Sequence, residues 1–447
     1  MSGEALHGYR GRPREALKEA GVGIGDLVRV EAGGRRYEGI LMPRLESADD
    51  RHLVIKLGSG YNIGVAFDDS SRVERLGSAE KPEFRPPPLP EVRPGLPRVS
   101  IISTGGTIAS RVDYVTGGVH AAISSRDLLS IVPELSDIAV VDADILYSVF
   151  SENIDATHWS GMARRVAEKI RGGADGVVVT HGTDTMGYSA AALSFALRGL
   201  PVPVVFVGSQ RSSDRPSSDA ATNLVGAVTA AAHAPFAEVA LAMHEDTSDA
   251  GIAFHRGTKV RKLHASGRYA FRSVNTEPLA RLVDGRLEML ASDCRPRGVG
   301  DLEVRDRFEE KVALVKFHPG FDPGVLTWLL DEGYRGIVLE GTGLGHVSSR
   351  CYGPLERAVG EGVAVGMTSQ CIWGRVNMNV YTTGRELLRI GVKPLGDMLP
   401  ETALVKLMWA LGEAGDADGA LELMRQNIAG EYSDRTIYEE DDDDGLR

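Results

Sequence analysis

The chain has 447 residues, of which 43% are hydrophobic and 25% are charged, as in an ordinary globular protein. At this length we expect about two to four domains. Its 62 acidic residues outnumber its 50 lysines and arginines, and the net charge of −12 argues against a protein that grips nucleic acid by itself.

The first part of the chain reads as a small all-β unit. Short segments with strand-like alternation and turn signals suggest a barrel of the SH3 or Sm-like kind over residues 1–82. Its charges are mixed, so an adaptor or packing role is favoured over RNA binding. The strand segments are residues 25–30, 37–42, 52–57, 61–66 and 71–76. Prolines crowd the stretch that follows, and we place an extended linker at 83–97.

After the linker, apolar runs alternate with helix-like stretches. This order predicts an α/β domain over residues 98–308, with a mostly parallel sheet, helices on both faces, and residues 271–308 as the connection to the next unit. The predicted strands are 99–102, 138–143, 177–179, 204–208 and 239–243, and the predicted helices are 157–170, 189–197 and 220–232.

A second, smaller α/β domain is predicted over residues 309–430, with strands at 312–317, 336–339 and 363–367. It ends in a helix at 401–411, whose stripe of Leu404, Leu407, Met408 and Leu411 is typical of core packing. Residues 431–447 form an acidic C-terminal tail, and we expect its acidic run at 439–444 to be solvated and disordered.

The three cysteines show no spacing typical of a metal site or redox motif, and an odd number cannot pair completely. This usage is typical of a reducing cytoplasm. The N-terminus has no apolar signal core, and no 18-residue apolar stretch occurs. We therefore expect a cytoplasmic protein without a membrane segment.

Two threonines beside glycines carry most of the chemical information. Residues 103–110 (STGGTIAS) follow one buried strand, and residues 181–185 (HGTDT) follow another. An open α/β sheet presents reactive side chains at such turns, so Thr107, Thr183 and Asp184 are expected to meet at the carboxyl edge of the sheet. A threonine hydroxyl is a poor nucleophile and needs a nearby base.

The base has several candidates in residues 256–266 (RGTKVRKLHAS). A buried lysine beside Asp184 could relay protons to Thr183, and the residues alone do not choose between Lys259 and Lys262. Taken alone, a segment of this composition is more often a solvated basic edge. No cluster of His, Cys and carboxylate residues has ligand spacing, so no metal site is predicted.

The order of these segments resembles that of the signature segments of bacterial-type L-asparaginases. The segments are residues 103–110, 181–185 and 256–266, and residues 208–211 and 218–224 also look like that family's strand and following helix. The resemblance implies an asparaginase-like two-domain parallel-sheet fold and hydrolysis of a side-chain amide through an acyl-enzyme. By this resemblance Thr107 is the nucleophile, Thr183 and Asp184 are its partners, and Lys262 is the catalytic lysine.

The resemblance also implies residues that bind the substrate. Ser151 and Glu152 match the segment that holds the α-carboxylate of the amino acid, and Gly182 lies beside the second threonine. Residues 111–120, which contain Tyr114, would be a mobile lid with glycines as a hinge.

Three further features are similar to the D subunit of the archaeal Glu-tRNA(Gln) amidotransferase: the small β unit, residues 368–378 (TSQCIWGRVNM) and residues 430–435 (GEYSDR). That resemblance implies a glutaminase that takes ammonia from glutamine or asparagine. A partner, the E subunit, would use ATP and Mg to convert Glu-tRNA(Gln) to Gln-tRNA(Gln). This chain would bind no cofactor, would meet tRNA(Gln) mainly through the partner, and would form a homodimer.

Two alternatives remain at this point. One is a free-standing L-asparaginase with an accessory N-terminal domain, and the other is a non-catalytic scaffold that docks a partner through the small barrel. The N-terminal unit and the C-terminal ending argue against the first alternative. Intact Thr107, Thr183, Asp184 and Lys262 argue against the second.

Overall fold

The computed structural model describes the protein over residues 6, 8–44, 49–58, 62–78, 95–106, 108, 110–112, 119–121, 129, 132–211 and 218–435. Several sequence predictions therefore lie outside the described residues: the nucleophile Thr107, the lid residue Tyr114, most of the linker at 83–94, and the tail from 436 onward.

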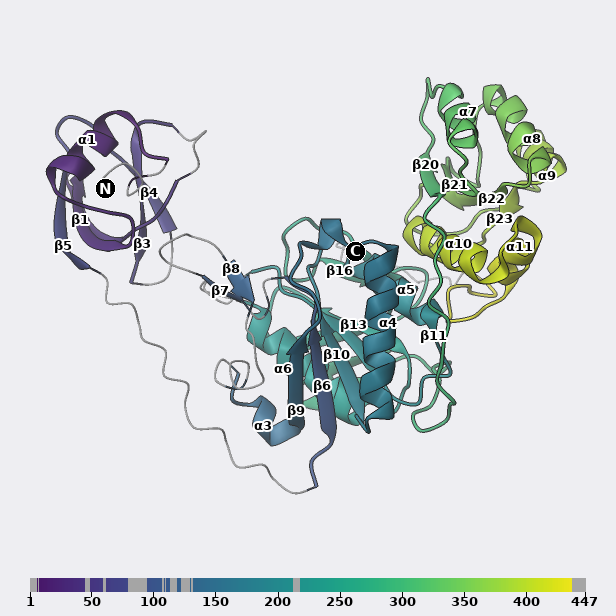
Figure 1. Ribbon diagram of the computed structural model, residues 1–447, viewed down its shortest axis with the longest axis horizontal. Helices are drawn as coiled ribbons and strands as arrows, with labels where there is room; N and C mark the ends of the chain where they lie inside the picture. Colours follow the sequence, from purple (N-terminus) through teal and green to yellow (C-terminus); the bar gives the residue numbers. More distant parts are fainter. Residues whose placement is uncertain are drawn as a thin grey trace, which may run out of the picture.

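The N-terminal unit is a five-stranded antiparallel sheet that wraps around its own apolar core (Figure 1). A two-residue turn of Gly33 and Gly34, with φ of 56° and 72°, joins the first two strands, and both positive values suit a tight hairpin. The sheet has the order β4-β3-β2-β1-β5. The strands are β1 (Asp26–Ala32), β2 (Arg35–Leu41), β3 (His52–Leu57), β4 (Asn62–Ala66) and β5 (Arg72–Ser78), as predicted.

A helix that we did not predict, α1 (Gly11–Glu19), packs on this sheet and buries Ala16 and Leu17. Its signal in the sequence is weak because it contains Pro13 near its start and has no side-chain N-cap. Burial of two apolar residues against the sheet stabilises it instead.

The large sheet has eight strands in the order β18-β17-β14-β13-β12-β10-β6-β9 (Figure 1). Five of them are parallel: β6 (Arg98–Ser103), β9 (Val140–Ile145), β10 (Gly176–Thr180), β12 (Val204–Val207) and β13 (Val239–His244). Three antiparallel strands extend one edge: β14 (Gly251–Arg256), β17 (Ala280–Val283) and β18 (Arg286–Met289).

Helices cover both faces of this sheet, as predicted. Val177 and Val179 of β10 pack toward α4 (Ala156–Arg171) and α5 (Met186–Ala196), whereas Val178 packs toward α6 (Ala220–His233) and α3 (Leu135–Ile138). Strands covered on both sides read as continuous apolar runs, which explains why the sequence revealed them. Asp155 begins α4 with a capping box to His158.

Residues 271–308 do not serve only as a connection, and that prediction was wrong in part. They contain β16 (Phe271–Ser273), paired with β15 (Val260–Lys262), the edge strands β17 and β18, and β19 (Glu303–Val304), paired with β11 (Leu197–Arg198). These strands are short and carry charges such as the Arg281–Glu288 pair, so they lack the apolar runs that mark buried strands. One further ribbon joins β7 (Ser110–Val112) and β8 (Val119–Ala121).

The smaller α/β unit has a four-stranded parallel sheet in chain order. Its elements are β20 (Val312–Lys316), α7 (Gly324–Asp331), β21 (Gly336–Gly341), η2 (Ser349–Cys351), α8 (Tyr352–Gly360), β22 (Ala364–Ser369), α9 (Thr382–Ile390) and β23 (Lys393–Pro394).

Helix α10 (Pro400–Ala414) lies between the two sheets, against α5 on one side and the small sheet on the other (Figure 1). The predicted stripe belongs to the core, and Leu407 and Leu411 are each 1% exposed. Burial extends around the helix and includes Trp409, because a helix between two units has no solvent face. The last helix, α11 (Ala417–Arg425), packs on α10.

Candidate active site

The two threonine turns leave neighbouring strands at the point where the chain direction through the sheet reverses. Among the parallel strands the order is β9-β6-β10-β12-β13, so the chain moves outward to β9 on one side of β6 and to β10 on the other. Ser103 at the end of β6 pairs with Thr180 at the end of β10. Open α/β sheets bind ligands in the crevice at such a switch point, beyond the carboxyl ends of the strands.

The backbones of the two turns are in direct contact. Thr104 donates from its backbone N–H and from Oγ1 to the carbonyl of Thr180, at 3.0 and 2.8 Å. Gly106 has φ of 83°, and a Cβ at this position would lie 2.8 Å from the backbone nitrogen of Gly182. Only glycine fits so close to another backbone in this conformation. The residue that follows, Thr107, lies outside the described residues.

Thr183, Asp184 and Lys262 form one hydrogen-bonded group. The Nζ of Lys262 is 2.8 Å from Oγ1 of Thr183 and 2.8 Å from Oδ1 of Asp184. The side chain of Lys262 is 14% exposed and that of Asp184 is 73% exposed, so solvent reaches the group from the side of Asp184. A cation shared between a hydroxyl and a carboxylate can stabilise negative charge and move a proton.

Lys259, the other lysine that the residues left open, has a different position. Its Nζ is 2.6 Å from Oδ2 of Asp397, and the two side chains are 1% and 2% exposed. Burial lowers the pKa of Lys259, and the negative charge of Asp397 opposes that shift. The geometry therefore brings Lys262, and not Lys259, to Thr183.

The predicted substrate-binding residues lie beside this group. Ser151 is buried in the short helix η1 (Ser151–Asn153), and a Cβ on Gly182 would lie 2.8 Å from Cβ of Ser151. Thr185, which we did not predict, donates from Oγ1 to the carbonyl of Ser151 at 2.6 Å and fixes η1 to the second turn. Glu152 lies on η1 with its side chain exposed.

A buried chain of hydrogen bonds supports the second turn from behind. Trp159 Nε1 donates to Ser189 Oγ at 2.9 Å, and Ser189 donates to Nε2 of His181 at 2.8 Å. Nδ1 of His181 then donates to the carbonyl of Gly182 at 2.7 Å. Burial lowers the pKa of His181 to about 4, so its imidazole is neutral and matches these partners. Sequence reasoning missed these hydrogen bonds, since the residues that form them come from separate elements.

This histidine predicts a loss of stability in mild acid. The unfolded imidazole binds a proton below its usual pKa of about 6.5, whereas the folded one stays neutral to about 4, so stability is full above this window and falls through it. Between about pH 7 and pH 5 we expect the unfolding free energy of the native chain to fall by about 2 kcal/mol more than that of His181→Gln. Urea unfolding at both pH values checks this. Equal losses in the two proteins would contradict it.

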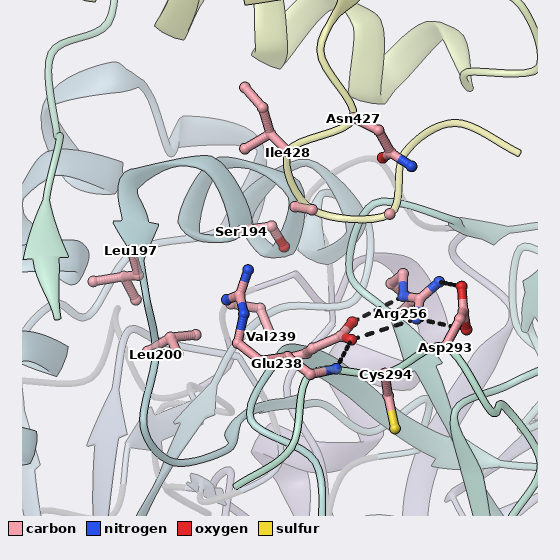
Figure 2. Close-up of a pocket in the computed structure, with 13 residues that line it drawn as sticks. Ser194, Leu197, Leu200, Glu238, Val239, Arg256, Asp293, Cys294, Asn427 and Ile428 are labelled. Atoms are coloured by element: carbon pink, nitrogen blue, oxygen red, sulfur yellow. Dashed lines mark hydrogen bonds and ion pairs between the residues drawn. The ribbon is translucent and has the colours of Figure 1, made fainter. Parts of the chain in front are cut away.

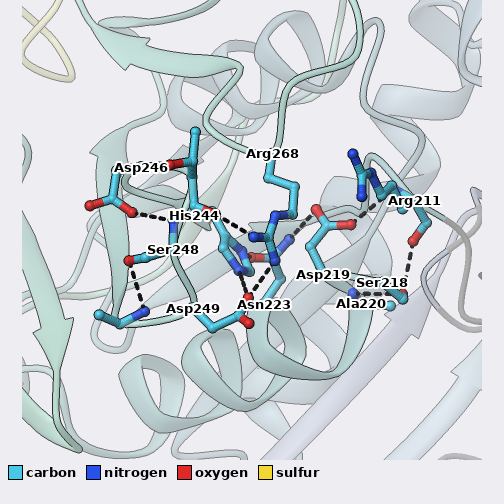
Figure 3. A network of polar contacts seen from close by, with 12 residues as sticks. Arg211, Ser218, Asp219, Ala220, Asn223, His244, Asp246, Ser248, Asp249 and Arg268 are labelled. Atoms are coloured by element: carbon cyan, nitrogen blue, oxygen red, sulfur yellow. Dashed lines mark hydrogen bonds and ion pairs between the residues drawn. The ribbon is translucent and has the colours of Figure 1, made fainter. Parts of the chain in front are cut away.

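A second polar network holds the residues that follow β12, beside the two threonine turns (Figure 3). Buried Asp219 accepts from the backbone N–H groups of Gln210 and Arg211 and from Nδ2 of Asn223, which also donates to the carbonyl of Gly208 at 3.0 Å. Gly208 in turn lies against the second threonine turn, where a Cβ would be 2.7 Å from Cγ2 of Thr183.

The network continues to the next strand, where Nδ1 of His244 lies 2.6 Å from Oδ1 of Asn223 and Nε2 lies 3.1 Å from Oδ1 of Asp249 (Figure 3). Arg268 also binds Asp249. The loops after β12 and β13 are thus fixed to each other. Gly208, directly after β12, is the residue through which this network contacts Thr183.

One cavity of about 260 Å³ lies at the opposite edge of the large sheet (Figure 2). It is lined by Val239, which begins β13, by Arg256, which ends the antiparallel strand β14, and by the loop 427–430. The amino ends of the parallel strands therefore lie there, away from the threonine turns. In the part of the chain that the structure describes, no group of three or more His, Cys, Asp or Glu side chains could hold a metal ion. Nor does any helix in that part have the length and apolar character needed to cross a membrane.

Three family models match successive parts of the chain. The GatD N-terminal domain matches residues 22–76, the N-terminal asparaginase domain matches 98–295, and the glutaminase/asparaginase C-terminal domain matches 311–424. The matches follow the order of the small β unit, the large sheet and the small sheet.

Whole-chain relatives decide the family. The chain is 52% identical to the glutamyl-tRNA(Gln) amidotransferase D subunit of Methanothermobacter thermautotrophicus, over 96% of this chain and 98% of the relative. It is 51% identical to the D subunit of Pyrococcus abyssi, over 96% and 99%. The chain belongs to the D-subunit family of glutamyl-tRNA(Gln) amidotransferases.

Solved structures agree with the fold of the two α/β units. The thermostable L-asparaginase from Thermococcus kodakarensis is 33% identical, covers 75% of this chain with 99% of its own, and gives a TM-score of 0.67. L-asparaginase I from Vibrio cholerae is 28% identical, covers 76% with 99% of its own, and also gives 0.67. The small β unit separates the D-subunit family from these shorter chains.

Proposed function

We propose that this site hydrolyses the side-chain amide of glutamine or asparagine, with Thr107, Thr183, Asp184 and Lys262 as its catalytic residues. The observation that carries the proposal is the position of Lys262 Nζ, 2.8 Å from both Thr183 Oγ1 and Asp184 Oδ1 at the switch point of the sheet. As a member of the D-subunit family, the chain is the glutaminase component of the tRNA-dependent amidotransferase. Its amidohydrolase chemistry supplies the ammonia that converts Glu-tRNA(Gln) to Gln-tRNA(Gln).

In the proposed reaction, the hydroxyl oxygen of Thr107 attacks the carboxamide carbon and its proton passes toward the Thr183 group. Backbone N–H groups of the glycine turns stabilise the negative oxygen of the tetrahedral intermediate. The carbon–nitrogen bond breaks, the nitrogen takes the proton and leaves as ammonia, and an ester to Thr107 remains. Water positioned by Thr183 then hydrolyses the ester and releases the amino acid.

The amino-acid end of the substrate would bind at the neighbouring group of Ser151, Glu152 and Gly182. Ser151 and the backbone beside Gly182 supply donors for an α-carboxylate, and Glu152 supplies a negative charge for an α-ammonium group. Contact between Ser151 and Gly182 supports this assignment, because the carboxylate donors then lie one residue from Thr183.

The rest of the amidotransferase reaction belongs to a partner. We propose that the E subunit binds ATP and Mg and holds tRNA(Gln), while this chain binds no cofactor and forms a homodimer. The net charge of −12 supports such a division, because tRNA binding depends on clustered lysines and arginines.

One experiment separates this function from its alternatives: ammonia release from glutamine and from asparagine, measured with the chain alone and with the partner and Glu-tRNA(Gln). Strong stimulation by the charged tRNA supports the amidotransferase role. Constant hydrolysis regardless of tRNA would indicate a free-standing asparaginase, and silence in every condition would indicate a scaffold.

Thr183→Ala is expected to lower kcat by roughly 10³-fold with glutamine, because it removes the hydroxyl through which protons pass. Thr229→Ala is the matched control, since Oγ1 of Thr229 donates to the carbonyl of Val225 within α6, away from the site. Ammonia release with glutamine as the only substrate measures kcat for both variants. Near-normal turnover in Thr183→Ala would remove this residue from the mechanism.

A further inference from the structure

Residues from the C-terminal part of the chain form hydrogen bonds to the turn that precedes β15, the strand that carries Lys262. The turn, residues 256–259, joins β14 to β15, and Lys259 donates to Oδ2 of Asp397 at 2.6 Å and to Oγ of Ser433 at 3.1 Å. The other carboxylate oxygen, Oδ1 of Asp397, accepts from the backbone N–H of Ser433 at 3.0 Å. Both oxygens of this buried carboxylate therefore accept hydrogen bonds, one from the turn and one from the C-terminal segment.

The preceding residues of the turn are held as well. Thr258 donates from Oγ1 to the carbonyl of Ala429 at 2.9 Å, and its own carbonyl accepts from Oγ1 of Thr402 at 2.9 Å. We call Asp397, Thr402, Ala429 and Ser433 the turn clamp. All four lie in or after the small α/β unit, so this unit and the segment that follows it grip a turn of the large one.

Arg256, at the start of the turn, pairs with Glu238 and Asp293 (Figure 2). The loop 427–430 passes directly over it, and a Cβ on Gly430 would lie 2.7 Å from Cδ of Arg256. Gly430 has a φ of 73°, and a side chain at this position would clash with Arg256. The C-terminal segment can therefore lie this close to the turn only with glycine at position 430.

Two sequence motifs without a role in hydrolysis meet at the clamp. Arg375, in residues 368–378, donates to the carbonyls of Ser433 and Asp434 at 2.8 and 3.2 Å. Its neighbour Gly374 exchanges two hydrogen bonds with Asn275, donating at 2.9 Å and accepting at 3.1 Å. Residues 368–378 and 430–435 thus brace one another and the strand pair that carries Lys262.

A short paired strand, β15, connects the turn to Lys262. Lys262 is the third residue of β15, which pairs with β16 in register from Val260 with Ser273 to Lys262 with Phe271. A strand rises about 3.3 Å per residue, so Lys259 and Lys262 lie about 10 Å apart along a paired ribbon with little freedom. A shift of the turn would therefore move Nζ of Lys262 relative to Thr183 and Asp184.

We propose that Lys259, Asp397 and Ser433 are positioning residues that hold Lys262 in its catalytic place. The inference rests on the proposed function, since it assumes that Lys262 acts in amide hydrolysis. Residues from the end of the small α/β unit and from the C-terminal segment thereby position Lys262 through Lys259.

Asp397→Asn tests the proposal, because an amide has one oxygen and cannot accept from both Lys259 and Ser433. We expect kcat with glutamine to fall by roughly 10- to 100-fold, the loss that a misplacement of about 1 Å produces. KM should stay within about twofold, since the substrate-binding residues are untouched. Backbone amides of β15 should exchange hydrogen faster. Ser433→Ala, a milder change that removes one acceptor of Lys259, should lower kcat about threefold in the same direction.

The matched control is Val228→Ala. Val228 is 0% exposed in the middle of α6, in the core on the face of the large sheet away from α5, and it is not a member of the turn clamp. Loss of two buried methyl groups should lower the melting temperature and leave kcat at the native level. Equal losses of kcat in the two variants, or a changed KM with unchanged kcat, would overturn the proposal.

The outcomes for the clamp and for the proposed function can be distinguished. If Asp397→Asn does not fold, the kcat and the β15 exchange of Ser433→Ala decide, and unchanged values of both overturn the proposal. If the native chain releases no ammonia, the proposed function fails. Hydrogen exchange of β15 in Asp397→Asn then still tests the clamp, and exchange equal to that of the native chain would overturn it.

Discussion

Replacing Lys262 by Met is expected to lower kcat for amide hydrolysis by roughly 10³-fold while the protein stays folded. The change removes the cation that lies 2.8 Å from both Thr183 Oγ1 and Asp184 Oδ1. Without it, the carboxylate and the hydroxyl lose their link, and negative charge that develops on Thr183 has no counterion. Lys262→Arg should be nearly as inactive, because a guanidinium is larger and does not release its proton.

Lys316→Met is the control for this prediction. Lys316 also pairs with a carboxylate, Glu340 at 3.0 Å, but it lies in the small α/β unit with its side chain 63% exposed. Ammonia release should stay at the native level in this variant, and melting temperatures should be similar in both. Native-level turnover in Lys262→Met would exclude the lysine from the mechanism.

Gly106→Ala is expected to disrupt the site at the point where the two threonine turns meet. Its φ of 83° is strained for alanine, and the new Cβ would lie 2.8 Å from the backbone nitrogen of Gly182, which cannot move without moving Thr183. We expect a loss of about 3 kcal/mol of unfolding free energy and at least about 100-fold in kcat. Urea unfolding and ammonia release measure the two effects.

The variant Gly362→Ala measures the effect of backbone strain without a steric clash. Gly362 has a similar φ of 77°, but no atom of the described residues lies within 4 Å of an added Cβ. This variant should lose about 1 kcal/mol of stability and retain native kcat. If Gly106→Ala behaves like Gly362→Ala, the two turns do not need their close approach.

The sequence was informative where burial on two sides produces unbroken apolar runs. The strands that end at Ser103 and Thr180 are of this kind, so both threonine turns could be placed at one edge of a parallel sheet from the residues alone. The antiparallel edge strands β17 and β18 were missed because one face is exposed and their residues alternate with charges.

The choice between the two lysines shows the limit of reasoning from residues alone. Lys259 and Lys262 are three apart, and nothing in their spacing says which one points to Thr183. The answer depends on Asp397, which is far away in the chain and binds Lys259 in the interior. The buried hydrogen bonds from Trp159 to His181 were hidden for the same reason, since their members meet only after β10, α4 and α5 have packed.

The position of the turn clamp late in the sequence has a consequence for the nascent chain during synthesis. The large sheet, with both threonine turns and β15, leaves the ribosome before Asp397 and Ser433 exist, and domains fold in that order. We therefore expect a nascent chain to contain the threonine turns and Lys262 without the residues that hold Lys262 in register. Hydrolysis by an unfinished chain should then be slower, by the roughly 10- to 100-fold expected of Asp397→Asn, until the segment around Ser433 has been made.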